Sequence, residues 1–209
     1  ADADDWSHPQ RLEVQAVALI KRPEHMANMT RSLRVTDTLQ TVRVDATSTR
    51  VNISSLMFRR NPVLERLTGF DEVRKAGDTE FVERISSAFG PEAVCRLDEC
   101  GALVQLTPDS LSRADFGIGW MHPDRRSYRR GFRAWHQQIA AGASAALTTT
   151  RRGPFPAPTQ FLDRQAETPV AEAAIVVAAG LRAVTTCAPD LSAEAQALHS
   201  LGQRVDWLE

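Results

Sequence analysis

Apolar residues recur with a helical period in four segments of the chain, which predicts four helices. These segments are residues 7–22, 61–69, 78–90 and 127–147. The first begins with Ser7 and Gln10 at the spacing of a capping box, and the third has Asp78 at its expected N-cap and Gly90 at its end. The apolar stripe of the first helix is Leu12, Ala16, Leu19 and Ile20. The stripe of the last is Tyr128, Phe132, Trp135 and Ile139.

The segments between these helices are rich in β-branched residues, which indicates strands. Residues 25–36 and 41–60 are expected to contain two or three of them. Residues 93–97 and 102–107 are expected to form a strand pair that turns at 98–101. Helices that alternate with strands in this way predict an α/β fold.

The last third of the chain has a different character. Residues 148–170 contain four prolines and little periodicity, so we expect a linker. Residues 171–209 follow with an apolar strand, a capped helix and a second strand, which is the beginning of a βαβ unit in a second α/β domain. The first domain is then residues 1–147. Because one helix cannot cover both faces of a sheet, and because no initiator Met is present, we expect the chain to be a piece of a longer protein.

Composition excludes some classes of function. The 209 residues carry a formal net charge of -1, whereas a domain that neutralises many phosphates is usually basic, so we expect no nucleic-acid partner. Cys95, Cys100 and Cys187 lack metal-ligand spacing, which favours reduced thiols in a cytoplasmic protein. No apolar run reaches the roughly 18 residues of a membrane span.

Three aspartates lie at the beginning of the chain, immediately before the first predicted helix. Asp2, Asp4 and Asp5 supply hard oxygen ligands that could share one Mg²⁺ or Mn²⁺, and such a cation often completes its shell with substrate phosphates. The alternative is a solvated acidic cluster that the helix dipole favours. An EF-hand is excluded because the central Gly and closing Glu are missing, and Trp6 stands where an aspartate-nucleophile phosphatase needs Thr or Val.

Four segments taken in order resemble family 2 glycosyltransferases of the GT-A fold, particularly bacterial polysaccharide-type enzymes. The segments are "DADDWSHPQRLEVQ", "NISSLMFRR", "LTGFDEVRKAGDTEFVERISSAFG" and "RRSYRRGFRAWH". The resemblance covers about residues 2 to 138. It implies metal-dependent transfer of a sugar from a nucleotide-sugar donor to a saccharide or other hydroxyl acceptor, usually with inversion, in polysaccharide or glycoconjugate synthesis. The half of the domain that precedes the Asp-x-Asp motif in this family is absent, so the resemblance implies an incomplete GT-A-type mixed sheet with flanking helices, and we expect an inactive fragment.

The resemblance also assigns roles to residues. Asp2, Asp4 and Asp5 match the metal and diphosphate motif, and Asp78 matches the carboxylate that accepts the proton of the acceptor hydroxyl. Such a base suits the reaction, because the attacking alcohol loses its proton as the new bond forms. Helix capping alone would also explain Asp78. Glu80 is the competing base, and we expect it to point to solvent.

The helix at 127–147 and the residues before it carry a basic face. Arg125, Arg126 and Arg129 are candidates to bind the donor diphosphate or an anionic acceptor, because guanidinium groups match phosphate geometry. A solvated face is the alternative. His122 and His136 are equal candidates for a third metal ligand, as C-terminal histidines are in some GT-A enzymes.

Two competing functions remain open at this point. The first is a non-catalytic interaction module whose basic helix docks on a partner or on an acidic membrane surface. The second is a phosphoryl-transfer enzyme that uses the same metal. For the glycosyltransferase we expect a cytoplasmic location, or one at the inner face of the membrane through peripheral association of the full-length protein.

Overall fold

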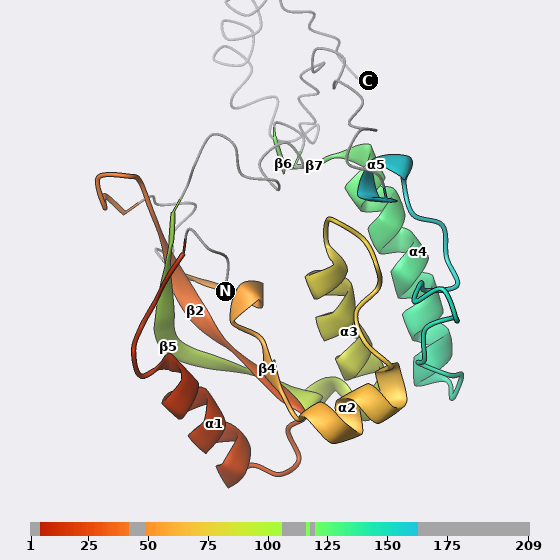
Figure 1. The fold of residues 1–209 in the computed structure, drawn as a ribbon, viewed down its shortest axis with the longest axis horizontal. Coiled ribbons are helices and arrows are strands. Elements are labelled where there is room, and N and C mark those ends of the chain that lie inside the picture. The colour runs from red at the N-terminus through yellow and green to blue at the C-terminus, as the bar shows by residue number, and fades with distance from the viewer. Residues whose placement is uncertain (1–4, 42–48, 106–115, 118–119, 163–209) are drawn as a thin grey trace, which may run out of the picture.

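The computed structural model describes residues 5–41, 49–105, 116–117 and 120–162. Figure 1 shows a twisted sheet on one side and a group of helices on the other. The strands are β1 (Trp6–Ser7), β2 (Ala27–Val35), β3 (Thr49–Val51), β4 (Met57–Phe58), β5 (Val94–Gln105), β6 (Phe116–Gly117) and β7 (Trp120–Met121). The helices are α1 (Arg11–Lys21), α2 (Arg60–Leu67), α3 (Gly77–Phe89), α4 (Pro123–Ala140) and α5 (Thr159–Leu162).

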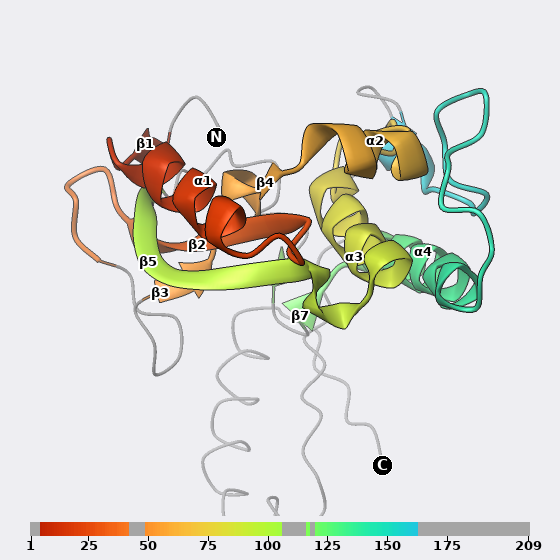
Figure 2. The ribbon, with the colours of Figure 1, turned by 90° about the horizontal axis from the view of Figure 1, so that it is seen from below.

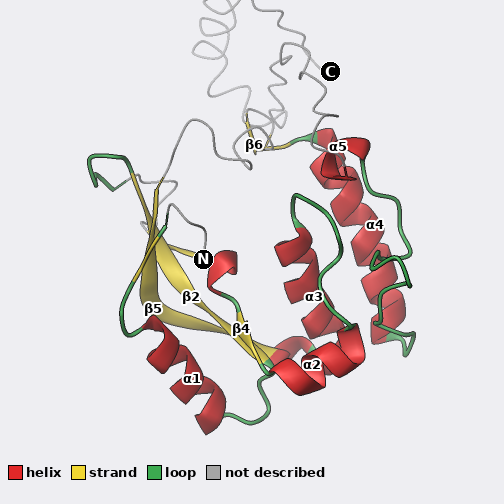
Figure 3. Ribbon diagram, in the orientation of Figure 1, coloured by secondary structure: helices red, strands yellow, loops and turns green. Residues whose placement is uncertain are grey.

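In the described part, five strands form one mixed sheet, and β6 and β7 form a separate pair. The sheet follows the order β1, β5, β2, β3, and β4 also pairs with β2. β2 and β5 are parallel, whereas the other pairs are antiparallel. The helices flank this sheet (Figure 3). The predicted α/β class with a mixed sheet and flanking helices is therefore confirmed.

The predicted strand pair at 93–107 is wrong, because Val94–Gln105 is one continuous strand. Its pairing with β2 runs from Ala27 and Val94 to Val35 and Gln105, with register shifts near the middle. The polar residues and the glycine at 98–101 therefore lie along an extended strand. Cys95 and Cys100 lie on this same strand, and both are free thiols.

Gly101 is required where β5 passes β2. A Cβ atom at this position would lie 2.4 Å from Thr30 Oγ1 and 3.0 Å from Arg11 Cγ. Gly101→Ala should therefore lower the free energy of unfolding by about 1–3 kcal/mol, the usual cost of overpacking. Chemical denaturation measures this loss. Adding Thr30→Ala removes the closest atom and should restore part of the stability, and strictly additive losses would contradict the steric explanation.

The N-terminus of α1 differs from the prediction. The helix begins at Arg11, and the preceding Gln10 makes no side-chain cap. Ser7 belongs to β1 instead, so the predicted capping box is wrong. The backbone N–H of Gln10 donates to Nδ1 of His8 at 3.2 Å. An imidazole therefore takes the place of the expected hydroxyl.

The face that α1 buries is also not the predicted stripe. Leu19 is buried, but Leu12 and Ile20 are 59% and 76% exposed. The fully buried Gln15 lies on the inner face and donates to Asn28 Oδ1 at 2.9 Å and to the Ser55 carbonyl at 2.7 Å. An amide network thus fastens α1 to β2, and periodicity alone could not reveal it because the network is polar.

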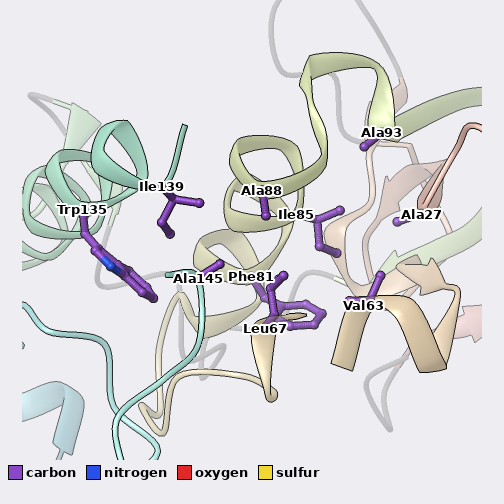
Figure 4. Packing of buried hydrophobic residues seen from close by; sticks show 10 residues of the cluster. All are labelled: Ala27, Val63, Leu67, Phe81, Ile85, Ala88, Ala93, Trp135, Ile139 and Ala145. Carbon is purple, nitrogen blue, oxygen red and sulfur yellow. The ribbon is translucent and has the colours of Figure 1, made fainter. Parts of the chain in front are cut away.

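The main core lies among α2, α3, α4 and the adjacent end of the sheet. Figure 4 shows Ile85 near Ala27 and Val63 on the sheet side of α3, with Trp135 and Ile139 on α4. α3 lies between the sheet and α4 (Figure 2). The predicted apolar stripe of α4 is confirmed, since all four of its residues are buried. Phe81, Val82 and Ile85 of the α3 stripe are buried as well.

The described part of the predicted linker, residues 148–162, packs against α4. Phe161 is fully buried beside Tyr128, and their rings are 5.3 Å apart. Phe155 contacts the rings of Tyr128 and Trp135. This segment therefore contributes to the core of the first domain. Residues 163–170 of the linker, and the predicted βαβ unit at 171–209, lie outside the described residues.

Within the described ranges, no helix combines the length and the apolar character that crossing a bilayer requires.

Candidate functional site at the first turn of α3

Asp78 lies in the first turn of α3. The helix begins at Gly77, and its N-cap is Ala76, which has a left-handed φ of 63° and provides no side-chain cap. The predicted N-cap role of Asp78 is therefore wrong. Its Oδ1 accepts from the backbone N–H of Thr79 at 2.6 Å, and its side chain is exposed. This position places the carboxylate in solvent, at the positive end of the helix dipole.

Glu80 behaves in the opposite way from the prediction. It was expected to point to solvent, but it is fully buried. Its Oε1 lies 3.0 Å from Nε of Arg84 and 2.9 Å from Nε2 of His136 on α4. A buried carboxylate is stable only with such partners. Glu80 is thus committed to the fold, which leaves Asp78 as the accessible carboxylate of this turn.

Arg84 makes hydrogen bonds to several backbone carbonyls in the interior between the helices. It is fully buried, and Nη1 donates to the carbonyls of Leu67 at 3.0 Å and Ala145 at 3.1 Å. Nη2 donates to the Gly69 carbonyl at 2.5 Å. Burial lowers the pKa of the guanidinium, although the Glu80 carboxylate acts in the other direction. One side chain therefore joins α3, the end of α2 and the segment after α4.

A second buried carboxylate, Asp71, lies in the connection between α2 and α3. Its Oδ1 accepts from Nε of Arg152 at 2.7 Å and from the backbone N–H of Gly153 at 2.9 Å. Its Oδ2 accepts from the Tyr128 hydroxyl at 2.7 Å. Burial and this hydrogen bond raise the pKa of the Tyr128 phenol well above its ordinary value. The phenol therefore keeps its proton throughout the normal pH range.

Sequence reasoning missed both networks. Glu80 and Arg84 are spaced i, i+4 inside the apolar stripe of α3, and that spacing was the available signal. Asp71 had no local signal, because Tyr128 and Arg152 follow it by 57 and 81 residues.

The predicted metal site falls largely outside the described residues. Asp2 and Asp4 lie there, whereas Asp5 is described and is half-buried just before β1. Among the residues with described positions, no group of three or more His, Cys, Asp or Glu side chains is arranged to hold a metal ion. The carboxylate donors at 2–5 suit Mg²⁺ or Mn²⁺ chemically, so the metal stays a prediction.

Both candidate third ligands have other roles in the fold. Nδ1 of His122 accepts from the Asp124 N–H at 3.2 Å and caps α4. Nε2 of His136 is 2.9 Å from Glu80 Oε1, and its Nδ1 is buried without a hydrogen-bond partner in the described structure. Neither arrangement selects one histidine over the other as a metal ligand.

The basic face of α4 is partly neutralised by α3. Arg129 lies 3.3 Å and Arg133 2.7 Å from the carboxylate of Glu83. The hydrogen bond to Glu83 raises the pKa of Arg133. Arg126 is exposed and donates to the Met121 carbonyl at 3.2 Å, whereas Arg125 is half-buried. Arg129 and Arg133 of α4 therefore share one carboxylate of α3.

A cavity of about 750 Å³ lies between α3, α4 and the beginnings of β2 and β5. Val82, Ser86 and His136 are among the residues that line it. Asp78 is outside this lining, one turn before Val82 along α3. The cavity and the candidate catalytic carboxylate are therefore separate features of the helix.

Comparison with models of protein families found no match, and a search of curated proteins found none either.

Proposed function

We propose that the chain is part of a metal-dependent glycosyltransferase that moves a sugar from a nucleotide-sugar donor to an acceptor hydroxyl, with inversion. The observation that carries the proposal is the contrast between the two carboxylates of the first α3 turn. Asp78 is exposed, and its hydrogen bonds within the described residues go to Thr79. Glu80 is buried and paired. Of these two carboxylates, Asp78 is thus the one that a substrate can reach.

In this proposal Asp78 accepts the proton of the acceptor hydroxyl as the oxygen attacks the anomeric carbon. Asp2, Asp4 and Asp5 would hold Mg²⁺ or Mn²⁺, whose charge would neutralise the departing nucleoside diphosphate. Arg125 and Arg126 are the proposed side chains for the diphosphate oxygens. The acceptor is a saccharide or another hydroxyl compound, and the proposed setting is polysaccharide or glycoconjugate synthesis in the cytoplasm or at the inner membrane face.

The alternative is an interaction module that docks through the basic face of α4. It receives less support, because Glu83 already pairs with Arg129 and Arg133 on that face. An exposed docking surface needs such charges to be available to the partner. The glycosyltransferase proposal does not depend on these two arginines.

The metal dependence of nucleotide binding tests the proposal. We expect the complete gene product to bind nucleoside diphosphate in Mn²⁺ or Mg²⁺ and to lose this binding in EDTA. Asp4→Asn should raise the dissociation constant by about tenfold or more, because a carboxylate ligand is lost, and tenfold corresponds to about 1.4 kcal/mol. Isothermal titration calorimetry measures both effects.

Asp37→Asn is the matched control, because Asp37 is an exposed aspartate in the turn after β2. It should leave binding unchanged. Metal-independent binding, or equal affinities for wild type and Asp4→Asn, would favour the interaction module instead. Product analysis then separates sugar transfer from phosphoryl transfer.

A further inference from the structure

The connection between α2 and α3, residues 68–76, is fastened along its whole length. The Gly69 carbonyl accepts from Nη2 of Arg84 at 2.5 Å. The backbone N–H of Glu72 donates to the Arg151 carbonyl at 3.1 Å, and that of Arg74 donates to the Phe161 carbonyl at 2.9 Å. A surface connection normally needs few such contacts. These hydrogen bonds at several points fix the path of the backbone between α2 and α3.

The carboxylate of Asp71 is the centre of this fastening. It is 2% exposed and receives three hydrogen bonds, from α4 through Tyr128 and from the following segment through Arg152 and Gly153. A carboxylate that accepts three donors in the interior is strongly held. Asp71 therefore fixes the connection to α4 and to residues 152–153 at once.

The backbone of Asp71 carries this restraint to the beginning of α3. Its carbonyl oxygen lies only 3.2 Å from the position that a Cβ atom on Gly77 would occupy, so it abuts the first residue of the helix. The same oxygen accepts from the Val73 N–H at 2.8 Å. Ala76, the residue before Gly77, has a φ of 63°, which costs free energy for a residue with a side chain. Asp78 is the residue after Gly77.

We propose that Asp71 is a positioning residue, whose buried carboxylate fixes the α2–α3 connection and thereby holds Asp78 in its working position. This inference rests on the proposed function, in which Asp78 accepts the proton of the acceptor. A displacement of about 1 Å at a reacting group can lower a rate by about 100-fold. Asp71 itself is buried and touches no substrate.

Hydrogen exchange on the 209-residue chain tests the structural part. Asp71→Ala removes all three hydrogen bonds, so the amides of residues 72–79 should exchange about tenfold faster, while those of β2 and β5 keep their protection. Arg152→Met is the second variant, because it removes one donor and keeps an apolar stem; it decides the question if Asp71→Ala does not fold. Glu72→Gln is the matched control, since it changes an exposed side-chain ion pair with Arg151 and keeps the backbone hydrogen bond of Glu72. Unchanged exchange at 72–79 in the folded variants would overturn the inference.

Kinetics on the complete gene product test the catalytic part. Asp71→Ala or Arg152→Met should lower kcat by about tenfold or more and leave KM for the donor within about twofold, because only the placement of Asp78 changes. Glu72→Gln should match wild type. If exchange is faster but kcat is unchanged in an active enzyme, the inference is overturned. If wild type transfers no sugar, the proposed function fails, and hydrogen exchange alone decides whether Asp71 holds the first turn of α3.

Discussion

Replacing Arg84 with methionine should lower the free energy of unfolding by about 3–5 kcal/mol. The change leaves the Glu80 carboxylate buried without its cation, and removing one partner of a buried ion pair costs this much. It also removes the donors to the carbonyls of Leu67, Gly69 and Ala145. Methionine fills part of the volume of the arginine side chain. The loss of stability therefore measures the missing charge and hydrogen bonds more than the cost of a cavity.

Urea denaturation followed by far-UV circular dichroism measures the loss. Arg130→Met is the matched control, because Arg130 is exposed on α4, and it should change the stability by less than about 0.5 kcal/mol. The double variant Glu80→Gln/Arg84→Met should be more stable than Arg84→Met alone, since the buried charge is gone. Equal stabilities of Arg84→Met and Arg130→Met would show that the buried pair contributes nothing.

Asp78→Asn should lower kcat for sugar transfer by about 10²–10⁴-fold in the complete gene product. Asparagine keeps the size and polarity of the side chain but cannot accept the proton of the acceptor hydroxyl, and general base catalysis contributes this range. Binding of the nucleoside diphosphate should not change, because Asp78 acts on the acceptor. The stability should change by less than about 1 kcal/mol, since the side chain is exposed and the Oδ1 of asparagine can still accept from the Thr79 N–H.

Steady-state kinetics with calorimetry of nucleotide binding separates these effects. Asp98→Asn provides the control, because this aspartate is 96% exposed and forms only a surface ion pair with Arg31. It should keep full activity. If Asp78→Asn also keeps full activity, another group accepts the proton and the proposed role of Asp78 is wrong.

Local periodicity predicted part of the helical structure, although it selected the wrong buried face for α1. The stripe of α4 is buried as expected, and α3 was placed almost to its ends. Both results depend on residues within a few turns of one another. The failures occurred where a distant segment decides the structure. β5 was read as two strands because its long pairing with β2 is not encoded locally.

The candidate site shows the same division. Asp78 was a candidate from the sequence because it stands before an apolar helical stripe, and its catalytic role stays a prediction. The environment of Glu80 could not be predicted, because first-turn carboxylates usually face solvent and His136 lies 56 residues away. Asp71 was missed for the same reason. Burial of a polar side chain depends on partners that only the folded chain brings together.

The parallel pairing of β2 with β5 also has a consequence for how the molecule folds. Ala27 pairs with Val94, 67 residues later, and both α2 and α3 lie between them. Closing so long a loop costs chain entropy before any ladder is gained, whereas the turns of α3 and α4 need only neighbouring residues. Helical signals should consequently appear early during refolding and the central ladder late, so a chain interrupted midway exposes the unpaired edge of β2.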